Sequence, residues 1–520
     1  MAFARVACRA QLGLSAPLVQ VEVGLASGLP AFCIVGLPAL VVREARERVR
    51  AALQNSGFEF PAGRITVSLA PADLPKEGGR FDLPIALGIL LASGQVRSAG
   101  AESPPREFYG ELGLTGELRP VRGLLPAAAA AAREEHELIV PRANAAEACA
   151  VAAQWVRAAG QLLEVCAHVA GVRPLAPGAV PEAAGGGPGS GCRCPTLDLT
   201  EVRGQLHAKR ALTVAAAGGH SLLMIGPPGC GKSMLARRLP ALLPPLSAAE
   251  ALEVAAIASL SGAGFRRELL SERPFRAPHH SSTAPALVGG GARAHPGEIS
   301  LAHQGVLFLD ELAEFPRHVL EALREPLETG VVAVARVARA AHYPAEFQLI
   351  AAMNPCPCGD FGDPAGSCSC TPAAVQRYRA RVSGPLLDRL DMHVEVPRVA
   401  AAEFEAPPAA GAGSAAAAAA VRRARELQRA RQGVCNARLS DAEMQRCCAP
   451  DRRGLRLLEV AMERLRLSGR ARQRVLKVAR TIADLEGRAA IGAAHLSEAL
   501  MMRCLDRATA PSGSCDRRPV

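Results

Sequence analysis

Hydrophobic and polar positions in the first third of the chain repeat with two different periods. Residues 18–25 (LVQVEVGL) and 64–71 (RITVSLAP) alternate with a period of two, which predicts strands. Residues 39–57 carry an apolar stripe at helical spacing among charged positions and end at a glycine, and residues 82–94 also predict a helix. This block is therefore predicted to mix helices with strands.

Apolar runs in the middle third are short and are separated by long connections. A helical segment at 206–219 precedes the run at 221–225, and similar runs follow at 306–309 and 348–353. Strands that are joined through helices pair in parallel and form an α/β sheet. The expected fold class is therefore α/β, with a parallel sheet in the central block.

The last block is almost entirely helical in its pattern, at 421–432, 452–465, 471–487 and 493–503. Residues 421–480 hold 17 Arg and Lys against 6 Asp and Glu, a surplus as large as the net charge of +11 on the whole chain. Such a surplus suggests a polyanionic partner. A solvated helical face explains it equally well.

Composition changes sharply at two joints. Residues 176–194 are rich in Pro, Gly and Ser, as flexible linkers are, and residues 405–420 are a second low-complexity stretch whose alanine run could start a helix. The sequence predicts an N-terminal domain at 1–175, a linker at 176–194, a central domain at 195–400, an Ala/Gly/Pro-rich joint at 401–420, a helical domain at 421–507 and a disordered tail at 508–520.

The cysteines and the N-terminus bear on the cellular compartment. The chain has 16 cysteines, and its start has no continuous apolar core of the secretory type. No stretch reaches the roughly 18 apolar residues that span a bilayer. We expect a reduced cytoplasmic protein with no membrane partner, in which clustered cysteines bind metal or pack rather than form disulfides.

The segment GPPGCGKS fits the phosphate-loop pattern at every position and stands between a strand and a helix. Glycines let the backbone wrap the phosphates, and the helix N-terminus adds its partial positive charge. Lys232 is expected to reach the β- and γ-phosphates of ATP, and the Ser233 hydroxyl to bind Mg²⁺. The expected nucleotide-binding residues are Gly226, Pro227, Pro228, Gly229, Cys230, Gly231, Lys232 and Ser233.

Further polar residues follow the other predicted strands of this sheet. Asp310 and Glu311 end the run GVLFLDE, where Asp310 is expected to hold Mg²⁺ through water and Glu311 to polarise the attacking water. Asn354 ends the next strand and could sense the γ-phosphate. Arg389 is a candidate finger, donated across a subunit boundary. The alternative for Arg389 is an ion pair with a neighbouring aspartate, Asp388 or Asp391.

Four cysteines form a C-x-C-x₉-C-x-C array: Cys356, Cys358, Cys368 and Cys370. Four thiolates can make a closed tetrahedral zinc site, and the loop between the pairs has little apolar content of its own. A structural Zn²⁺ ion is one interpretation. A reduced cysteine-rich surface loop is the other, because C-x-C is tighter than the usual C-x₂-C.

Several long motifs resemble the ComM/YifB subfamily of magnesium-chelatase-like AAA+ ATPases, over about residues 1–505. The motifs are FRAPHHSSTAPALVGGG (275–291), HPGEISLAHQGVLFLDELAEF (295–315), AAMNPCPCG (351–359), RVSGPLLDRLDMH (381–393), ELGLTGELRPVRG (111–123) and LSGRARQRVLKVARTIADLEG (467–487). The resemblance implies an AAA+ core, an N-terminal Lon-protease-like α+β domain of S5 type and a C-terminal helical lid.

The same resemblance implies a homo-hexameric ring that hydrolyses ATP with Mg²⁺. In such a ring Arg389 serves the neighbouring subunit, and Arg470 of the lid is the second sensor, with Arg474 as the alternative. Proteins of this subfamily are implicated as DNA helicases in branch migration during natural transformation, so single-stranded or branched DNA is the expected partner. The candidate pore residues are Arg276, His279, His280, Arg336 and Arg339.

Two other functions remain open from the sequence. A chelatase motor, which remodels a partner protein for metal insertion, would use the same ATPase core. An ATP-dependent protease would need a Ser nucleophile and a Lys base in the Lon-like block. The motif register places Arg80 and Ala127 at these positions. The N-terminal block is therefore expected to be non-catalytic.

Overall fold

The structure is a computed structural model of the 520-residue chain. It describes residues 2–36, 40–99, 104–178, 197–261, 264–291, 294–335, 340–363, 366, 368–400, 403 and 413–508. Most of the expected linker, the two hairpin arginines Arg336 and Arg339, and the tail from residue 509 lie outside this description.

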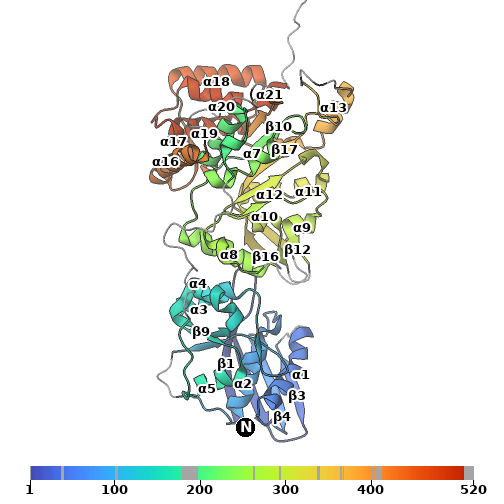
Figure 1. Cartoon of the computed structure of the whole chain (residues 1–520), viewed down its shortest axis with the longest axis vertical. Coiled ribbons are helices and arrows are strands. Elements are labelled where there is room, and N and C mark those ends of the chain that lie inside the picture. Colours follow the sequence, from blue (N-terminus) through green and yellow to red (C-terminus); the bar gives the residue numbers. More distant parts are fainter. Residues whose placement is uncertain are drawn as a thin grey trace, which may run out of the picture. The chain divides into compact units, whose positions relative to one another are not determined.

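The chain divides into two compact units, and neither is one continuous stretch (Figure 1). The N-terminal unit comprises residues 1–191 together with two later segments, 248–271 and 335–343. The second unit comprises residues 192–247, 272–334 and 344–520, so the helical C-terminal block forms one compact unit with the central sheet.

The N-terminal unit is built on a seven-stranded sheet of order β3-β4-β2-β1-β5-β8-β9. Strand β2 pairs antiparallel with β1 and β4, and the other neighbours pair in parallel. The predicted strands at 18–25 and 64–71 are confirmed as β2 and β4. The strands are β1 (Ala2–Arg9), β2 (Leu18–Ala26), β3 (Ala31–Val35), β4 (Arg64–Ala70), β5 (Arg106–Phe108), β8 (Glu137–Pro141) and β9 (Val156–Ala159), with a small pair β6 (Glu111–Leu112) and β7 (Leu118–Arg119).

Helices of this unit bury a core of valine, leucine and isoleucine against the sheet. Helix α2 is apolar on nearly every position and lies on β1 and β2, where a Cβ on Gly88 would come within 2.5 Å of a Val23 methyl group. Glycine is therefore what permits this close approach. The helices are α1 (Leu40–Asn55), α2 (Asp82–Ala92), α3 (Leu124–Arg133), α4 (Ala145–Ala152), α5 (Leu162–Val169) and α8 (Ala248–Leu260).

The second unit contains a five-stranded sheet of order β11-β14-β17-β10-β18, in which every pair is parallel. This confirms the predicted parallel sheet and its runs at 221–225, 306–309 and 348–353. The strands are β10 (Leu222–Ile225), β11 (Phe275–Arg276), β14 (Val306–Leu309), β17 (Gln348–Met353) and β18 (Met392–Glu395); two short pairs are β12 (Gly289–Gly290) with β13 (His295–Pro296) and β15 (Val331–Ala335) with β16 (Ala340–Pro344).

Helices surround this sheet and form the C-terminal part of the unit (Figure 1). Those of the sheet region are α6 (Leu206–Gly218), α7 (Lys232–Ala236), α9 (Ala284–Val288), α10 (Glu298–Leu301), α11 (Arg317–Glu321), α12 (Arg324–Thr329), α13 (Pro372–Arg379) and α14 (Gly384–Leu387). Those of the lid are α16 (Ser414–Gln432), α17 (Asp441–Cys447), α18 (Arg452–Leu465), α19 (Gly469–Leu485), α20 (Ala493–Met501) and α21 (Cys504–Ala508). The predicted helical C-terminal block is thus confirmed.

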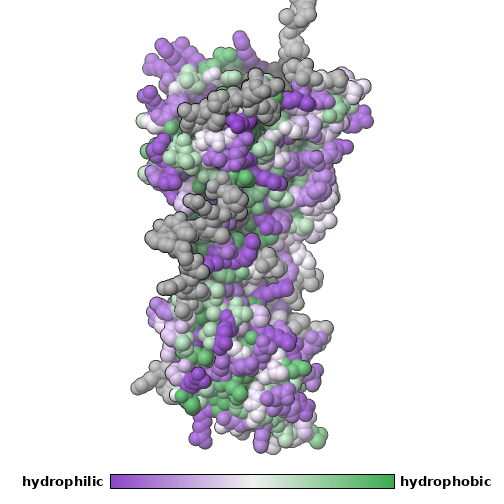
Figure 2. All heavy atoms as spheres, viewed as in Figure 1, coloured by the Kyte–Doolittle hydropathy of each residue, from purple (hydrophilic) through white to green (hydrophobic). Residues whose placement is uncertain are grey.

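Among the described helices, none combines the length and the apolar character needed to cross a bilayer. Hydrophilic and hydrophobic residues are interspersed over the face drawn in Figure 2.

Candidate nucleotide-binding site

The phosphate loop connects β10 to α7 at the carboxyl edge of the five-stranded sheet. All four residues of β10 are buried. Gly226 follows, and a Cβ there would lie 2.0 Å from the carbonyl oxygen of Val396. Gly229 and Gly231 have φ angles of 77° and 97°, which residues with side chains rarely adopt. The path of the loop therefore requires glycine at all three positions.

Lys232 is held inside this loop at the start of α7. Its Nζ donates to the carbonyl oxygens of Gly226 at 2.6 Å and Pro227 at 2.8 Å, and lies 3.3 Å from Asn354 Oδ1. Burial lowers the pKa of Lys232. A desolvated ammonium group gains more from an anionic phosphate than an exposed one does. The loop thus brings together Lys232 and Asn354, which the sequence predicted at the ends of different strands.

Ser233 and Asp310 meet across the carboxyl edge of the sheet. The Ser233 hydroxyl donates to Asp310 Oδ2 at 2.6 Å, although Ser233 lies in α7 after β10 and Asp310 directly follows β14. Hydroxyl and carboxylate oxygens are the ligands that Mg²⁺ prefers, usually together with phosphate oxygens and water. The donor set therefore fits the metal that the sequence predicted.

Glu311 carries a contact that the sequence did not predict. It sits in the left-handed region with φ 52°, and its Oε2 lies 3.0 Å from Nδ1 of His280. The His280 ring contacts that of His279 in a tilted arrangement, with centroids 4.0 Å apart. Arg276, grouped with these histidines in the sequence, instead makes a two-point ion pair with Glu298, 2.6 Å for both bonds. The FRAPHH segment thus reaches the candidate water-polarising carboxylate.

Arg389 lies at the other end of the strands, where their amino ends meet. Its backbone oxygen accepts from the hydroxyl of Ser221, the residue before β10, at 3.4 Å. Its guanidinium is buried, donates to Pro385 O at 2.7 Å and pairs with Glu328 of α12 at 2.8 Å. Among the residues that the structure describes, neither Asp388 nor Asp391 forms an ion pair with Arg389, whose partner is Glu328.

The two lid arginines have different environments. Arg474 Nη1 lies 2.8 Å from Oδ1 of the buried Asp391, whose Oδ2 accepts from the backbone N–H of Ser221. Burial raises the pKa of Asp391, but the charges of Arg474 and His220 outweigh it and hold that pKa well below its ordinary value. Arg470 is 60% exposed and 3.9 Å from Glu328. Arg474 therefore has a structural partner, whereas Arg470 presents a largely exposed guanidinium.

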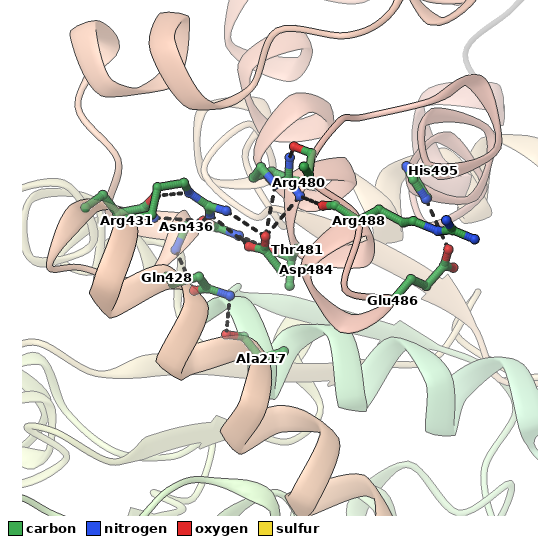
Figure 3. Close-up of polar contacts among 12 residues, drawn as sticks. Ala217, Gln428, Arg431, Asn436, Arg480, Thr481, Asp484, Glu486, Arg488 and His495 are labelled. Carbon is green, nitrogen blue, oxygen red and sulfur yellow. Dashed lines mark hydrogen bonds and ion pairs between the residues drawn. The ribbon is translucent and has the colours of Figure 1, made fainter.

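A buried polar cluster joins the lid helices to one another (Figure 3). Asp484 of α19 receives two bonds from Arg431 of α16, at 2.7 and 2.9 Å, and a further bond from Asn436 Nδ2 at 2.8 Å. Asn436 also donates to the Thr481 hydroxyl, which lies 2.7 Å from Nε2 of His220 in the sheet region. Buried charges are costly unless they are paired and hydrogen-bonded, and these are. The cluster therefore fixes α19, and with it Arg474, against the sheet.

The four predicted cysteines converge. All four Sγ atoms lie within 4.8 Å of one another, and the shortest separation is 3.3 Å, between Cys356 and Cys358. Four sulfurs around Zn²⁺ at about 2.3 Å stand about 3.8 Å apart, so the thiols are close to the required tetrahedron. The cluster follows β17 and Asn354 directly, and a Cβ on Gly359 would approach Pro228 of the phosphate loop to 2.6 Å. It thus adjoins the nucleotide site.

Three family models match successive parts of the chain. They are "Magnesium chelatase, subunit ChlI" at residues 198–404, "Subunit ChlI of Mg-chelatase" at 21–144 and "Magnesium chelatase, subunit ChlI C-terminal" at 411–503. The first match contains the phosphate loop, Asp310, Glu311 and Arg389. Fold, site and matches together define a magnesium-chelatase-like AAA+ protein.

Individual proteins of known sequence that resemble this chain show to which subfamily of this class it belongs. The chain is 49% identical to the competence protein ComM of Haemophilus influenzae and 48% identical to YifB of Salmonella typhimurium, in both cases over 98% of each chain. The magnesium-chelatase 38 kDa subunit of Rhodobacter capsulatus is 27% identical over 31% of this chain and 51% of its own. The chain therefore belongs to the ComM/YifB subfamily of the magnesium-chelatase-like AAA+ ATPases.

Removal of the buried lysine tests the nucleotide site. We expect Lys232→Ala to reduce ATP affinity or turnover by about 10- to 100-fold, because a charge-assisted contact to phosphate contributes about 1.5–3 kcal/mol. Nucleotide titration and phosphate release measure the two quantities. Lys209→Ala in α6, outside the loop, is the control. Unchanged binding and turnover in Lys232→Ala would remove the assignment.

The two lid arginines should separate by stability and turnover. Arg474→Ala removes the arginine partner of the buried Asp391 carboxylate, which costs about 3–5 kcal/mol of unfolding free energy. Arg470→Ala, at an exposed site, should change that free energy by less than about 1 kcal/mol while lowering ATP turnover. Urea unfolding and ATPase assays of both variants measure this. A large loss of stability in Arg470→Ala, with turnover intact, contradicts the assignment.

Proposed function

We propose that this chain is an ATP-hydrolysing ring motor that acts on DNA as a helicase and promotes branch migration of recombination intermediates during natural transformation. The observation that carries the ring is the separation of Arg389 from the phosphate loop of its own subunit. The four residues of β18 separate the amino ends of the strands, where Arg389 lies, from their carboxyl ends, where the phosphate loop lies, by about 10 Å. Arg389 then serves the nucleotide of a neighbour, and the resemblance makes that ring a hexamer.

In this ring each group has a distinct task. Lys232 binds the β- and γ-phosphates, and Ser233 and Asp310 hold Mg²⁺, which neutralises phosphate charge. Glu311 polarises the attacking water, and Asn354 orients it beside the γ-phosphate. Arg389 of the neighbouring subunit stabilises the charge that develops on the transferred phosphoryl group, an effect worth about 10³–10⁵ in rate for an arginine finger. The exposed Arg470 of the lid is the second sensor.

The DNA partner is supported by the similarity to a competence protein and by the basic lid segment at 421–480. Basic side chains grip phosphates without reading bases, which suits a motor that moves along any sequence. In this proposal ATP hydrolysis moves single-stranded or branched DNA through the ring, in the cytoplasm. The candidate pore residues are Arg276, His279, His280, Arg336 and Arg339.

The N-terminal unit is proposed to be a Lon-protease-like scaffold without catalysis. Arg80 is 4% exposed, and its guanidinium donates to Gln11 Oε1 at 2.8 Å and to the carbonyl oxygen of Arg122 at 2.5 Å. Ala127 is fully buried in α3. Neither position offers a nucleophile or a base, so proteolysis has no support at this site.

A chelatase-type motor, remodelling a partner protein for metal insertion, is the second candidate, favoured by the descriptions of the family models. The chelatase relative matches only 31% of this chain, whereas the competence relative matches 98%. The first proposal therefore has the broader support. Stimulation of ATPase turnover by forked DNA supports the helicase, and stimulation by a chelatase partner alone supports the second candidate.

A branch-migration assay on a synthetic four-way junction tests the proposed function. With ATP, the wild-type chain should convert the junction to forked products. Glu311→Gln keeps the shape but not the charge of the proposed water-polarising group, so turnover should fall about 10²–10⁴-fold and conversion with it. Glu253→Gln, an exposed glutamate of α8, is the matched control. Vigorous ATP turnover with no effect on any junction or fork would contradict the DNA motor.

A metal assay tests the proposed structural zinc at Cys356, Cys358, Cys368 and Cys370. Purified wild-type protein should contain about one zinc ion per chain, and Cys356→Ser should lose it, because a closed site needs four thiolates. Elemental analysis of both measures the ratio. Cys33→Ser, at an exposed cysteine elsewhere, should keep the metal. Wild-type protein that is free of zinc after growth with zinc would exclude the site.

A further inference from the structure

The N-terminal unit contains two segments of the magnesium-chelatase sequence match. The match covers residues 198–404, but 248–271 and 335–343 inside it belong to the compact unit formed by residues 1–191. Helix α8 makes up most of the first segment, and it stands in the sequence between α7 and β11, both of which belong to the ATPase unit. A helix that belongs to the ATPase match in sequence is thus part of the N-terminal unit in the structure.

Helix α8 is held there by specific bonds at its carboxyl end. The hydroxyl of Ser259 donates to Oε1 of Glu147, and the carbonyl oxygen of Ser259 accepts from the N–H of Gly123 at 3.1 Å. Ser259 is 2% exposed and Glu147 is 7% exposed. The next residue, Leu260, packs so closely that a Cβ on Gly123 would lie 2.8 Å from its Cδ2 atom.

The acceptor side of this contact is built from the N-terminal unit alone. Oε1 of Glu147 also accepts from the N–H of Leu125 in the first turn of α3, and Oε2 accepts from Asn144 Nδ2 at 3.0 Å. Asn144 in turn holds both the N–H and the carbonyl oxygen of Val121 at 2.9 Å. This network fixes Gly123 and α3. These residues and Glu147 form the socket for α8, and hydrogen bonds within the N-terminal unit hold that socket in place.

Helix packing extends the contact. Helix α8 lies on α3 (Figure 1), and both helices are rich in alanine, which lets backbones approach closely. The second segment makes a separate contact, since a Cβ on Gly13 would lie 3.7 Å from that of Ala341.

We propose that α8 is the docking element by which the ATPase part of the chain holds the N-terminal unit, so that the peptide linker at 176–194 is not needed to keep them together. A buried hydroxyl–carboxylate bond, a backbone bond and a packed leucine are the marks of a permanent contact rather than a passing one. Because α8 connects α7 and β11, a movement of these elements during the ATP cycle carries the N-terminal unit with it.

Cleavage of the linker tests this directly. A specific protease site is placed at residues 184–189 of the full chain, and the cut protein is passed over a size-exclusion column in 0.15 M and 0.5 M salt. The N-terminal fragment and the ATPase fragment should elute together in both, since Ser259, Leu260 and Glu147 are buried and salt screens buried contacts much less than exposed ones. Elution of the wild-type fragments as separate species overturns the proposal.

Two substitutions in the cleavable chain locate the contact. Leu260→Asp buries a carboxylate in the socket and should release the N-terminal fragment after cleavage. Ala249→Asp adds the same group at an exposed position of the same helix and should leave the fragments together. Continued co-elution in Leu260→Asp, with unfolding midpoints equal to wild type, counts against α8 as the docking element.

The elution test does not depend on the proposed DNA activity. In uncut protein, Leu260→Asp should keep ATP turnover within about twofold of wild type and should lose most junction conversion, because the N-terminal unit no longer follows the ATPase. If wild-type protein moves no junction, the proposed function fails, whereas co-elution of the fragments still supports the docking.

Discussion

The five-stranded parallel sheet imposes the constraint on which the rest of the site depends. In a parallel sheet all carboxyl ends lie at one edge, so Lys232, Asp310 and Asn354 gather there from three different strands. Residues that precede a strand lie at the opposite, amino ends of the sheet. Arg389, which precedes β18, therefore lies beside Ser221, which precedes β10. The phosphate loop thus lies at one end of the strands and a buried arginine at the other, which is the arrangement that the proposed ring requires.

Ion pairs connect the lid to the amino ends of the strands, near Arg389. Asp391 takes Arg474 from the lid and the backbone of Ser221 from the sheet, while Glu328 lies near both Arg389 and Arg470. The buried Asp391 contributes little net stability through its pair with Arg474, but the loss of that partner is expensive, so the pair enforces one arrangement. A shift of α19 would therefore move Arg474 and, through it, Asp391, which lies two residues after Arg389.

The sequence was sufficient for elements whose pattern is local. The phosphate loop and β10, β14 and β17 could be predicted because short apolar runs end in glycine, aspartate or asparagine. Strand β1 was missed, since arginines interrupt its alternation. The partners of Arg389 and Glu311 could not be predicted, because Glu328 and His280 approach them only through the fold. The association of α8 with the N-terminal unit was equally hidden, as its alanine-rich pattern fits any partner helix.

Mixing two inactive variants measures most directly whether the two edges act between subunits. Lys232→Ala lacks the phosphate ligand, and Arg389→Ala lacks the finger. If each site needs Lys232 of one subunit and Arg389 of the next, mixed rings at equal concentration should recover about one quarter of wild-type ATP turnover, because random assembly makes that fraction of interfaces complete. Turnover of the mixture no higher than that of either variant alone, in rings shown to exchange subunits, would contradict the account.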